Sequence, residues 1–128
     1  MTDLGRYLLV AAGSAVGGCA RYAVGNLLAA RVEGGFPFGT FVVNATGCFV
    51  IGFLLSWGLG RAPVDPAWRL LVATGFCGGY TTFSAFAWET VRLAEGGNLA
   101  YAAANVAGSA VAGLLAVLAG STLARAAA

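Results

Sequence analysis

Histidine and lysine are both missing from this sequence of 128 residues, and charged side chains make up only 9% of it. A soluble domain usually carries about 25% charged residues, because it needs polar surface to stay in water. Hydrophobic residues instead make up 59% of the chain, and its mean hydropathy is +0.84. The shortage of charge excludes a soluble globular domain and predicts an integral membrane protein.

The lack of histidine also removes the commonest general base and metal ligand. Both aspartates lie outside the long apolar stretches, and the three cysteines, Cys19, Cys48 and Cys77, form no CxxC pair. Each cysteine falls inside an apolar stretch, where a free thiol behaves as a small hydrophobe, so we expect neither a disulfide framework nor a thiolate metal site. We do not expect an enzyme, and the net charge of +2 is too small to recruit nucleic acid.

Charged residues divide the chain into four apolar stretches, at about residues 7–28, 38–59, 70–94 and 99–123. Each is at least as long as the roughly 20 residues that a helix needs to cross a bilayer core of about 30 Å. A cleaved signal peptide is the alternative for the first stretch, but the stretch is longer than an h-region and has its arginine inside it. We predict an all-α membrane protein with four transmembrane helices in a single domain over residues 1–128.

The seven arginines give little indication of orientation. Four of them would lie on one side of the membrane and two on the other, so the usual bias toward the cytoplasm is weak. A chain that inserts both ways round would have this pattern. A small protein can also have it by accident.

Small residues recur every four positions along the first stretch, where Gly13, Gly17 and Gly25 share a helix face with Arg21. Small residues at this spacing let two helix backbones approach closely, either within one subunit or against a second copy. An arginine at depth costs at least about 2.5 kcal/mol unless it is paired or reaches the interface. We interpret Arg21 as an anchor or a bridge between subunits, with capture of entering anions as the alternative.

Asn44 lies about two turns into the second stretch, among Val, Ile and Phe. An amide in hydrocarbon must find hydrogen-bond partners, because leaving it unpaired costs a few kcal/mol. A structural hydrogen bond between helices is one interpretation. The other is that Asn44 offers its NH₂ group to a passing polar species.

The third stretch carries the strongest local pattern, GFCGGYTTFSAF over residues 75–86. Two adjacent glycines followed by threonines and a serine make a poor helix, since each glycine costs about 1 kcal/mol relative to alanine. Irregular backbone at bilayer depth is tolerated only where protein or a polar cavity covers it, and its free carbonyls often coordinate cations. We predict that the third helix breaks here and that the break marks a site.

Phe83 and Phe86 follow this break three residues apart, so they share one helix face. Two phenylalanines at this spacing are typical of simple packing. Thr82 and Ser84 place hydroxyl donors beside them, however, and the edge of a phenyl ring carries partial positive charge. These four side chains would then escort a small anion through several weak sites, as conduction requires.

Polar side chains form a stripe on the fourth stretch, where Tyr101, Asn105 and Ser109 are spaced by four residues. A polar stripe on a membrane helix usually faces protein or water rather than lipid. Together with Asn44 and the hydroxyls beside the break, this stripe is expected to line a continuous path.

At the level of motifs, the chain resembles the CrcB/Fluc family of fluoride channels over nearly its whole length. The matching motifs are Gly17-Gly18-x-x-Arg21-Tyr22, Gly39-Thr40-x-x-Val43-Asn44-x-x-Gly47, Gly75-Phe76-Cys77-Gly78-Gly79-x-Thr81-Thr82-Phe83-Ser84-x-Phe86, and the less specific Asn105-x-x-x-Ser109.

The resemblance implies a fluoride-selective passive channel in the bacterial inner membrane, which exports cytoplasmic fluoride and so lowers its toxicity. It also implies an antiparallel, dual-topology homodimer that frames two fluoride pores and holds a structural sodium ion at its centre. By position, the backbone carbonyls of Gly78 and Thr81 would bind the sodium. The side chains that would line the pores are those of Asn44, Thr82, Phe83, Ser84, Phe86, Tyr101 and Ser109.

A small multidrug-type antiporter is the main alternative, because it too is a four-helix, dual-topology dimer. Antiport needs a membrane-embedded carboxylate to exchange protons for a cation, and the first three stretches offer only Glu89, near the far end of the third. A non-transporting assembly subunit is a second alternative, but it would have no reason to keep a broken helix and a polar stripe.

Overall fold

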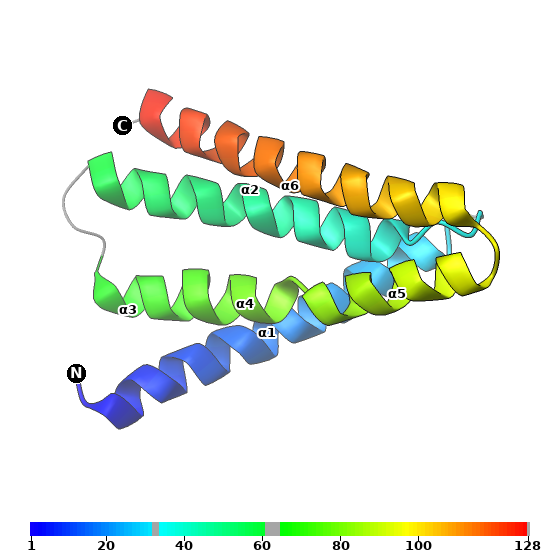
Figure 1. The fold of residues 1–128 in the computed structure, drawn as a ribbon. Coiled ribbons are helices and arrows are strands. Elements are labelled where there is room, and N and C mark those ends of the chain that lie inside the picture. Colours follow the sequence, from blue (N-terminus) through cyan, green and yellow to red (C-terminus); the bar gives the residue numbers. More distant parts are fainter. Residues whose placement is uncertain (32–33, 61–64, 128) are drawn as a thin grey trace.

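The computed structural model describes residues 1–31, 34–60 and 65–127, and every secondary-structure element in this part of the chain is a helix (Figure 1). Helix α1 spans Asp3–Ala29 and begins at Thr2, whose hydroxyl accepts a hydrogen bond from the Gly5 N–H at 3.2 Å. Helix α2 spans Phe38–Gly60, and α6 spans Leu99–Ala126. Each is long and apolar enough to cross a membrane.

The third spanning element, Pro66–Glu95, is made of several pieces. It consists of α3 (Pro66–Trp68), a π-helical segment η1 (Arg69–Cys77), α4 (Gly78–Tyr80) and, after two extended residues, α5 (Phe83–Glu95). Four membrane-spanning helices and a broken third helix are thus confirmed. The spans run up to four residues beyond the predicted ranges at most ends. The third span, for example, begins at Pro66 rather than residue 70, because Asp65 caps a helical turn outside the apolar stretch.

The elements run back and forth, so that both termini lie at the same end of the bundle (Figure 1). Helices α2 and α6 lie side by side as one pair. The second pair consists of α1 and the first half of the third span, η1 and α4. Beyond the bend, α5 packs against α6. Residues at the bend therefore lie between the two pairs, in the middle of the molecule.

Glycines allow both pairs to approach closely. A side chain added at Gly13 or Gly17 of α1 would collide with the carbonyl oxygens of Leu71 and Phe76. On the other pair, one added at Gly120 of α6 would collide with a backbone carbonyl of α2. Gly13 and Gly17 thus pack within the subunit, as one of the two interpretations of this face predicted.

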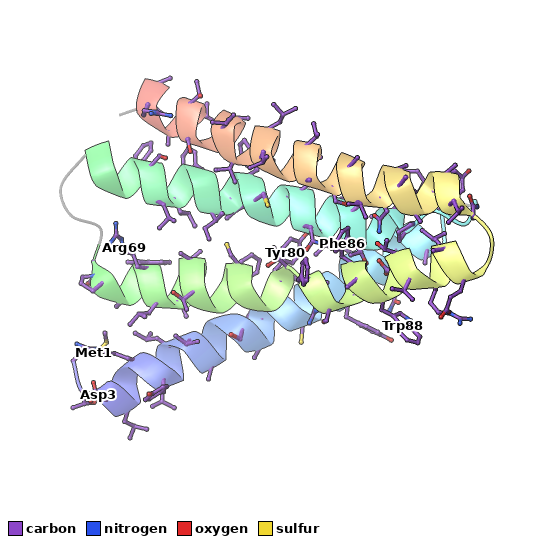
Figure 2. All side chains as sticks on the ribbon, in the orientation of Figure 1. Met1, Asp3, Arg69, Tyr80, Phe86 and Trp88 are labelled. Atoms are coloured by element: carbon purple, nitrogen blue, oxygen red, sulfur yellow. The ribbon has the colours of Figure 1, made fainter. Side chains whose placement is uncertain are left out.

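Little of each span is covered within one subunit. Only 11–17% of the most apolar stretch of each spanning helix is buried, and the large hydrophobic side chains of α1, α5 and α6 are widely exposed (Figure 2). In water such a surface would aggregate, so lipid or a further protein surface must cover it.

Candidate functional site

The break in the third span lies at Thr81 and Thr82. Both residues have extended backbone, with φ and ψ of −80° and 159° at Thr81 and −151° and 120° at Thr82. The two glycines singled out in the sequence are instead helical, since Gly78 has φ −63° and ψ −38°. The expectation of a break is confirmed. The chain departs from the helix at the β-branched threonines, which favour extended backbone.

The glycines before the break serve packing. A Cβ atom at Gly79 would lie 2.5 Å from the Ser14 carbonyl oxygen, so only glycine lets α4 sit this close to α1. Gly78 faces the other way and has no atom within 4 Å of an added Cβ, so its side of the bend is open in the single subunit.

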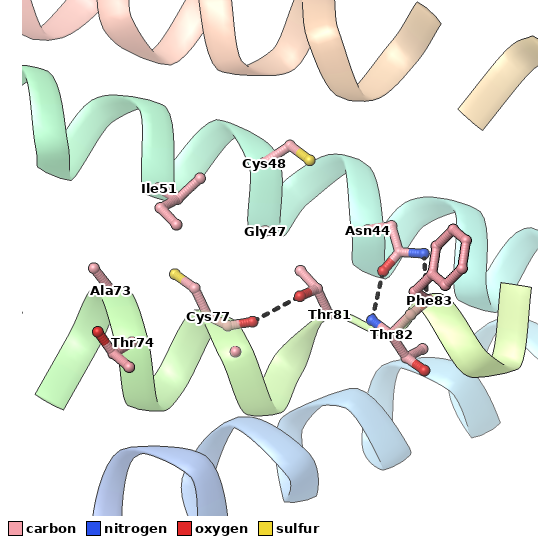
Figure 3. Close-up of a pocket in the computed structure, with 11 residues that line it drawn as sticks. Asn44, Gly47, Cys48, Ile51, Ala73, Thr74, Cys77, Thr81, Thr82 and Phe83 are labelled. Carbon is pink, nitrogen blue, oxygen red and sulfur yellow. Dashed lines mark hydrogen bonds between the residues drawn. The ribbon is translucent and has the colours of Figure 1, made fainter. Parts of the chain in front are cut away.

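Asn44 of α2 holds the break open. Its side-chain Oδ1 accepts a hydrogen bond from the Thr82 N–H at 2.7 Å, and its Nδ2 donates to the Thr82 carbonyl at 3.0 Å (Figure 3). Both backbone groups of an extended residue at membrane depth are therefore satisfied by one side chain. The structural interpretation of Asn44 is confirmed. One N–H of its amide group is already in use.

The same break deprives two carbonyls of their helical donors. In a continuous helix the Thr82 N–H would donate to the Gly78 carbonyl, but it donates to Asn44 instead. The Ala85 N–H would donate to the Thr81 carbonyl, but it donates to the Thr82 hydroxyl at 3.2 Å. The carbonyls of Gly78, just before the break, and of Thr81, within it, are thus left without their helical donors.

Donors and aromatic rings gather where α5 begins. The Thr82 hydroxyl caps α5 and lies 3.3 Å from the Ser84 hydroxyl. The rings of Phe83 and Phe86 lie 5.5 Å apart at 40°, and Phe83 is 79% exposed. The structure thus brings these four predicted site residues together beside Asn44.

A cavity of about 530 Å³ lies between α2 and the third span (Figure 3). Its walls are mainly apolar, with a few polar groups from the bend. Among the residues that line it are Asn44, Cys48, Cys77, Gly78, Thr81, Thr82 and Phe83. No cluster of His, Cys, Asp or Glu suited to a metal ion occurs in the described residues. The oxygen atoms at this cavity are those of backbone carbonyls, the Asn44 amide and the threonine hydroxyls.

The polar stripe of α6 turns toward α5. Asn105 is fully buried, accepts a hydrogen bond from the Ser109 hydroxyl at 3.3 Å and donates to the Thr90 hydroxyl at 2.9 Å. Thr90 in turn donates to the Phe86 carbonyl at 2.7 Å, so this chain of hydrogen bonds reaches back to the phenylalanine pair. Thr90 had no signal in the sequence, because its only distinguishing feature is the buried amide opposite it on α6.

Tyr101 lies apart from these residues, whereas Arg21 shares a cavity with Thr82. Tyr101 is at the beginning of α6, where its ring packs edge-on against Phe36 with centroids 6.0 Å apart. Arg21 lines a smaller cavity of about 140 Å³ together with Thr40, Thr82 and Ala85. Its guanidinium has no ion-pair partner in the described part of the chain, as the ion pairs found there are Arg6–Asp3 and Arg92–Glu95.

Nothing in the sequence indicated that Thr40 and Glu89 form a pair, but the structure brings them together. The Thr40 hydroxyl on α2 donates to Glu89 Oε1 on α5 at 2.7 Å, and Glu89 Oε2 is buried with no hydrogen-bond partner among the described residues. Tyr80 makes another link to α2, through its hydroxyl and that of Thr46 at 3.0 Å. These links fix both halves of the broken helix on α2.

Comparison with known proteins finds relatives over nearly the whole chain. Residues 8–121 match the family model described as CrcB-like protein, Camphor Resistance (CrcB). A protein of Solibacter usitatus (strain Ellin6076) named "Fluoride-specific ion channel FluC" is 46% identical over 120 residues, covering 94% of this chain and 98% of the relative. Proteins with the same name from Koribacter versatilis (strain Ellin345) and Chlorobium phaeobacteroides (strain DSM 266 / SMG 266 / 2430) are 44% and 42% identical, covering 93% and 98% of this chain and 94% and 96% of the relatives.

Proposed function

The chain belongs to the CrcB family, and we propose that it is a fluoride-selective passive channel that lets fluoride leave the cell. It is a multi-pass membrane protein, and its relatives are bacterial proteins named for fluoride conduction. Those names give no support to the antiporter alternative, and they describe a channel rather than an enzyme.

The proposal rests on the broken third helix and on the hydroxyl groups and aromatic rings that lie beside the break. Hydroxyl donors of Thr82 and Ser84 and the ring edges of Phe83 and Phe86 meet where α5 begins. The N-terminal end of α5 also carries partial positive charge from its free N–H groups. An anion passing here would find several weak donors and no full positive charge to trap it, which suits rapid conduction.

We propose that the fluoride path continues from this cluster along α6. Asn105 and Ser109 extend the hydrogen-bonded chain away from Phe86, and Tyr101 lies about one turn before Asn105, at the beginning of α6. The Asn44 amide has one N–H left after its bond to Thr82, so it can both hold the break and face the path. Arg21 would attract anions toward the cavity that it shares with Thr82.

A second copy of the chain would complete the pore. Phe83 is 79% exposed and touches one other aromatic ring, Phe86, so in a single subunit the path has an open side. Gly18 and Gly78 also have open space where a close neighbour would fit. The near-balanced arginines favour two copies in opposite orientations, so we propose an antiparallel, dual-topology homodimer.

Sodium fits the freed carbonyls as a structural ion of this dimer. Backbone carbonyls of a broken membrane helix are typical Na⁺ ligands, and the bend frees those of Gly78 and Thr81. One subunit offers two such oxygens, which is too few to replace the hydration shell of an ion. Two subunits meeting at Gly78 would offer four, so ion binding and dimer formation would depend on each other.

Growth in fluoride tests the function in cells. A bacterial strain without its own fluoride channel should grow in fluoride when it expresses this chain, and should not grow when it expresses a Phe83→Ile, Phe86→Ile double variant at the same level in the membrane. Equal growth with both proteins would show that Phe83 and Phe86 are not needed for fluoride export. No protection by the unaltered chain, despite its presence in the membrane, would contradict fluoride export.

A further inference from the structure

We propose that the chain binds one anionic phospholipid at the end of the bundle where α2 ends and the third span begins. The phosphate group of the lipid would lie on Arg69, and its acyl chains would lie in two apolar pockets beside η1. This binding is independent of the proposed channel function. It involves an arginine that the proposed fluoride path does not use.

Arg69 has a free guanidinium group at the beginning of η1. The group is exposed and forms no ion pair or hydrogen bond with the described residues, whose two ion pairs join other side chains. Asp65, one turn earlier, accepts the Ala67 N–H at 2.8 Å and forms no ion pair with Arg69. A guanidinium at the edge of a membrane span is stabilised by an anionic partner, and its planar donors match a phosphate group.

Two tryptophans indicate that Arg69 lies at the level of the lipid headgroups. Trp57 is in the last turn of α2, and Trp68 directly precedes Arg69, so both lie at the same end of the bundle. The Trp68 side chain is largely exposed. Tryptophan rings gather at the boundary between hydrocarbon and water, which accommodates both their apolar body and their N–H group. Lipid phosphate groups lie at this boundary too.

An apolar pocket of about 210 Å³ lies beside Arg69, between α2 and the third span. Its lining residues are Leu54, Leu55, Trp57, Trp68, Arg69, Val72 and Ala73. Arg69 is the one charged residue among those described that line it, and Figure 2 shows Arg69 at the beginning of the third span. Pockets that enclose a whole small ligand measure about 300–1,000 Å³, so this one would hold part of a chain whose remainder lies in the bilayer.

A second apolar pocket adjoins the first at Val72. It has a volume of about 420 Å³ and lies between α1 and η1, where it is lined by Ala12, Gly13, Val16, Leu71, Val72 and Phe76. Because Val72 lines both pockets, they flank η1 on its two sides. A phospholipid has one charged headgroup and two acyl chains. One lipid would therefore place its phosphate on Arg69 and one chain in each pocket.

The charge of Arg69 selects the class of lipid. One arginine near the membrane surface enriches an anionic lipid by about fivefold. A zwitterionic lipid carries its own cationic group beside the phosphate, which competes with the guanidinium. The lipid expected at this site is therefore one whose phosphate diester is its only charged group, such as phosphatidylglycerol.

Quenching of tryptophan fluorescence by brominated lipids tests the site. A Trp88→Phe background leaves Trp57 and Trp68 as the only tryptophans. This protein is reconstituted into phosphatidylethanolamine bilayers that contain a small share of phosphatidylglycerol or of phosphatidylcholine, each with the same brominated chains. We expect about fivefold enrichment of phosphatidylglycerol over phosphatidylcholine around the two tryptophans.

Three variants in the same background show whether Arg69 causes this enrichment. Arg69→Gln should abolish it, and Arg69→Lys should keep part of it because the positive charge remains. Arg92→Gln is the matched control, since Arg92 is also exposed but lies beyond the bend and pairs with Glu95. Equal quenching by the two brominated lipids, or an enrichment that survives Arg69→Gln, would overturn the proposal.

Native mass spectrometry identifies the occupant of the site. The unaltered protein is released from detergent in the presence of phosphatidylglycerol and of sodium phosphate at the same concentration. We expect a retained adduct with the mass of phosphatidylglycerol that is missing from Arg69→Gln. A phosphate adduct in place of the lipid would overturn the proposal, and so would an Arg69→Gln protein that keeps the lipid but loses its dimer, because a second copy would then occupy the pocket. If the unaltered protein carried no fluoride, the channel function would fail while the lipid result still stood.

Discussion

Replacing Asn44 should close the break in the third span. The Asn44 side chain makes two hydrogen bonds with the Thr82 backbone, at 2.7 and 3.0 Å. Each such bond contributes about 1 kcal/mol in protein interiors and in membranes. Asn44→Ala therefore removes about 2 kcal/mol from the extended conformation, which is about a 30-fold change in its population relative to competing ones.

The released Thr82 N–H has an obvious alternative acceptor. It would return to the Gly78 carbonyl and extend α4 by helical bonding, so the carbonyl proposed to bind sodium would be lost together with the path. We expect Asn44→Ala to reduce fluoride efflux from liposomes by at least about tenfold, in line with that shift in population. Asn44→Asp keeps the acceptor for Thr82 N–H but sets an oxygen against the Thr82 carbonyl and adds negative charge, so we expect its efflux to be slower still.

Asn26→Ala is the matched control, because Asn26 is an exposed amide on α1. It should leave both efflux and thermal unfolding unchanged. The reasoning is refuted if Asn44→Ala conducts fluoride at the unaltered rate and unfolds at the unaltered temperature. In that case the two hydrogen bonds neither hold the break nor position the path.

Three further predictions follow from the bend and its packing. Phe83→Ile and Phe86→Ile should each lower fluoride efflux by about tenfold or more, while the protein still elutes as a dimer, because a branched alkyl group has no positive edge; unchanged efflux in both would show that the rings only pack. Exchange of sodium for a large organic cation should slow efflux and lower the thermal stability of the dimer, since the Gly78 carbonyls would lose their ion, and equal behaviour in both salts would count against the cation site. Gly17→Leu should reduce thermal stability by about 1–3 kcal/mol because the added side chain collides with η1 at the Phe76 carbonyl, and unchanged stability would contradict the packing described for α1.

The number and lengths of the spans could be predicted from the sequence because the bilayer imposes one simple requirement. A helix that crosses it must be apolar for about 20 residues, so charged residues such as Arg31 and Asp65 mark the ends. The break could also be predicted, since GGYTTFS is a poor helix. Its exact position could not be predicted, because a glycine in a membrane helix indicates either a break in the helix or close packing against a neighbouring helix. Gly79 is required by the close approach of Ser14, and the chain leaves the helix two residues later, at Thr81.

The partners of the polar side chains could not be predicted for a related reason. Asn44 was equally compatible with a structural and a conducting role until Thr82 was placed opposite it. Thr90 and Glu89 carry no local pattern that distinguishes them from packing or surface residues. Their importance comes from Asn105 and Thr40, which lie on other helices and are far away in the sequence.

Passive efflux from liposomes tests the central claim most directly. Vesicles containing the purified protein are loaded with the potassium salt of fluoride or of chloride and diluted into a medium that contains neither anion and imposes no proton gradient. A potassium ionophore lets K⁺ leave with the anion, and ion-selective electrodes follow the efflux. A fluoride channel predicts rapid fluoride loss with little chloride loss. Retention of both anions by vesicles that demonstrably contain folded protein, or equal loss of the two, would contradict it.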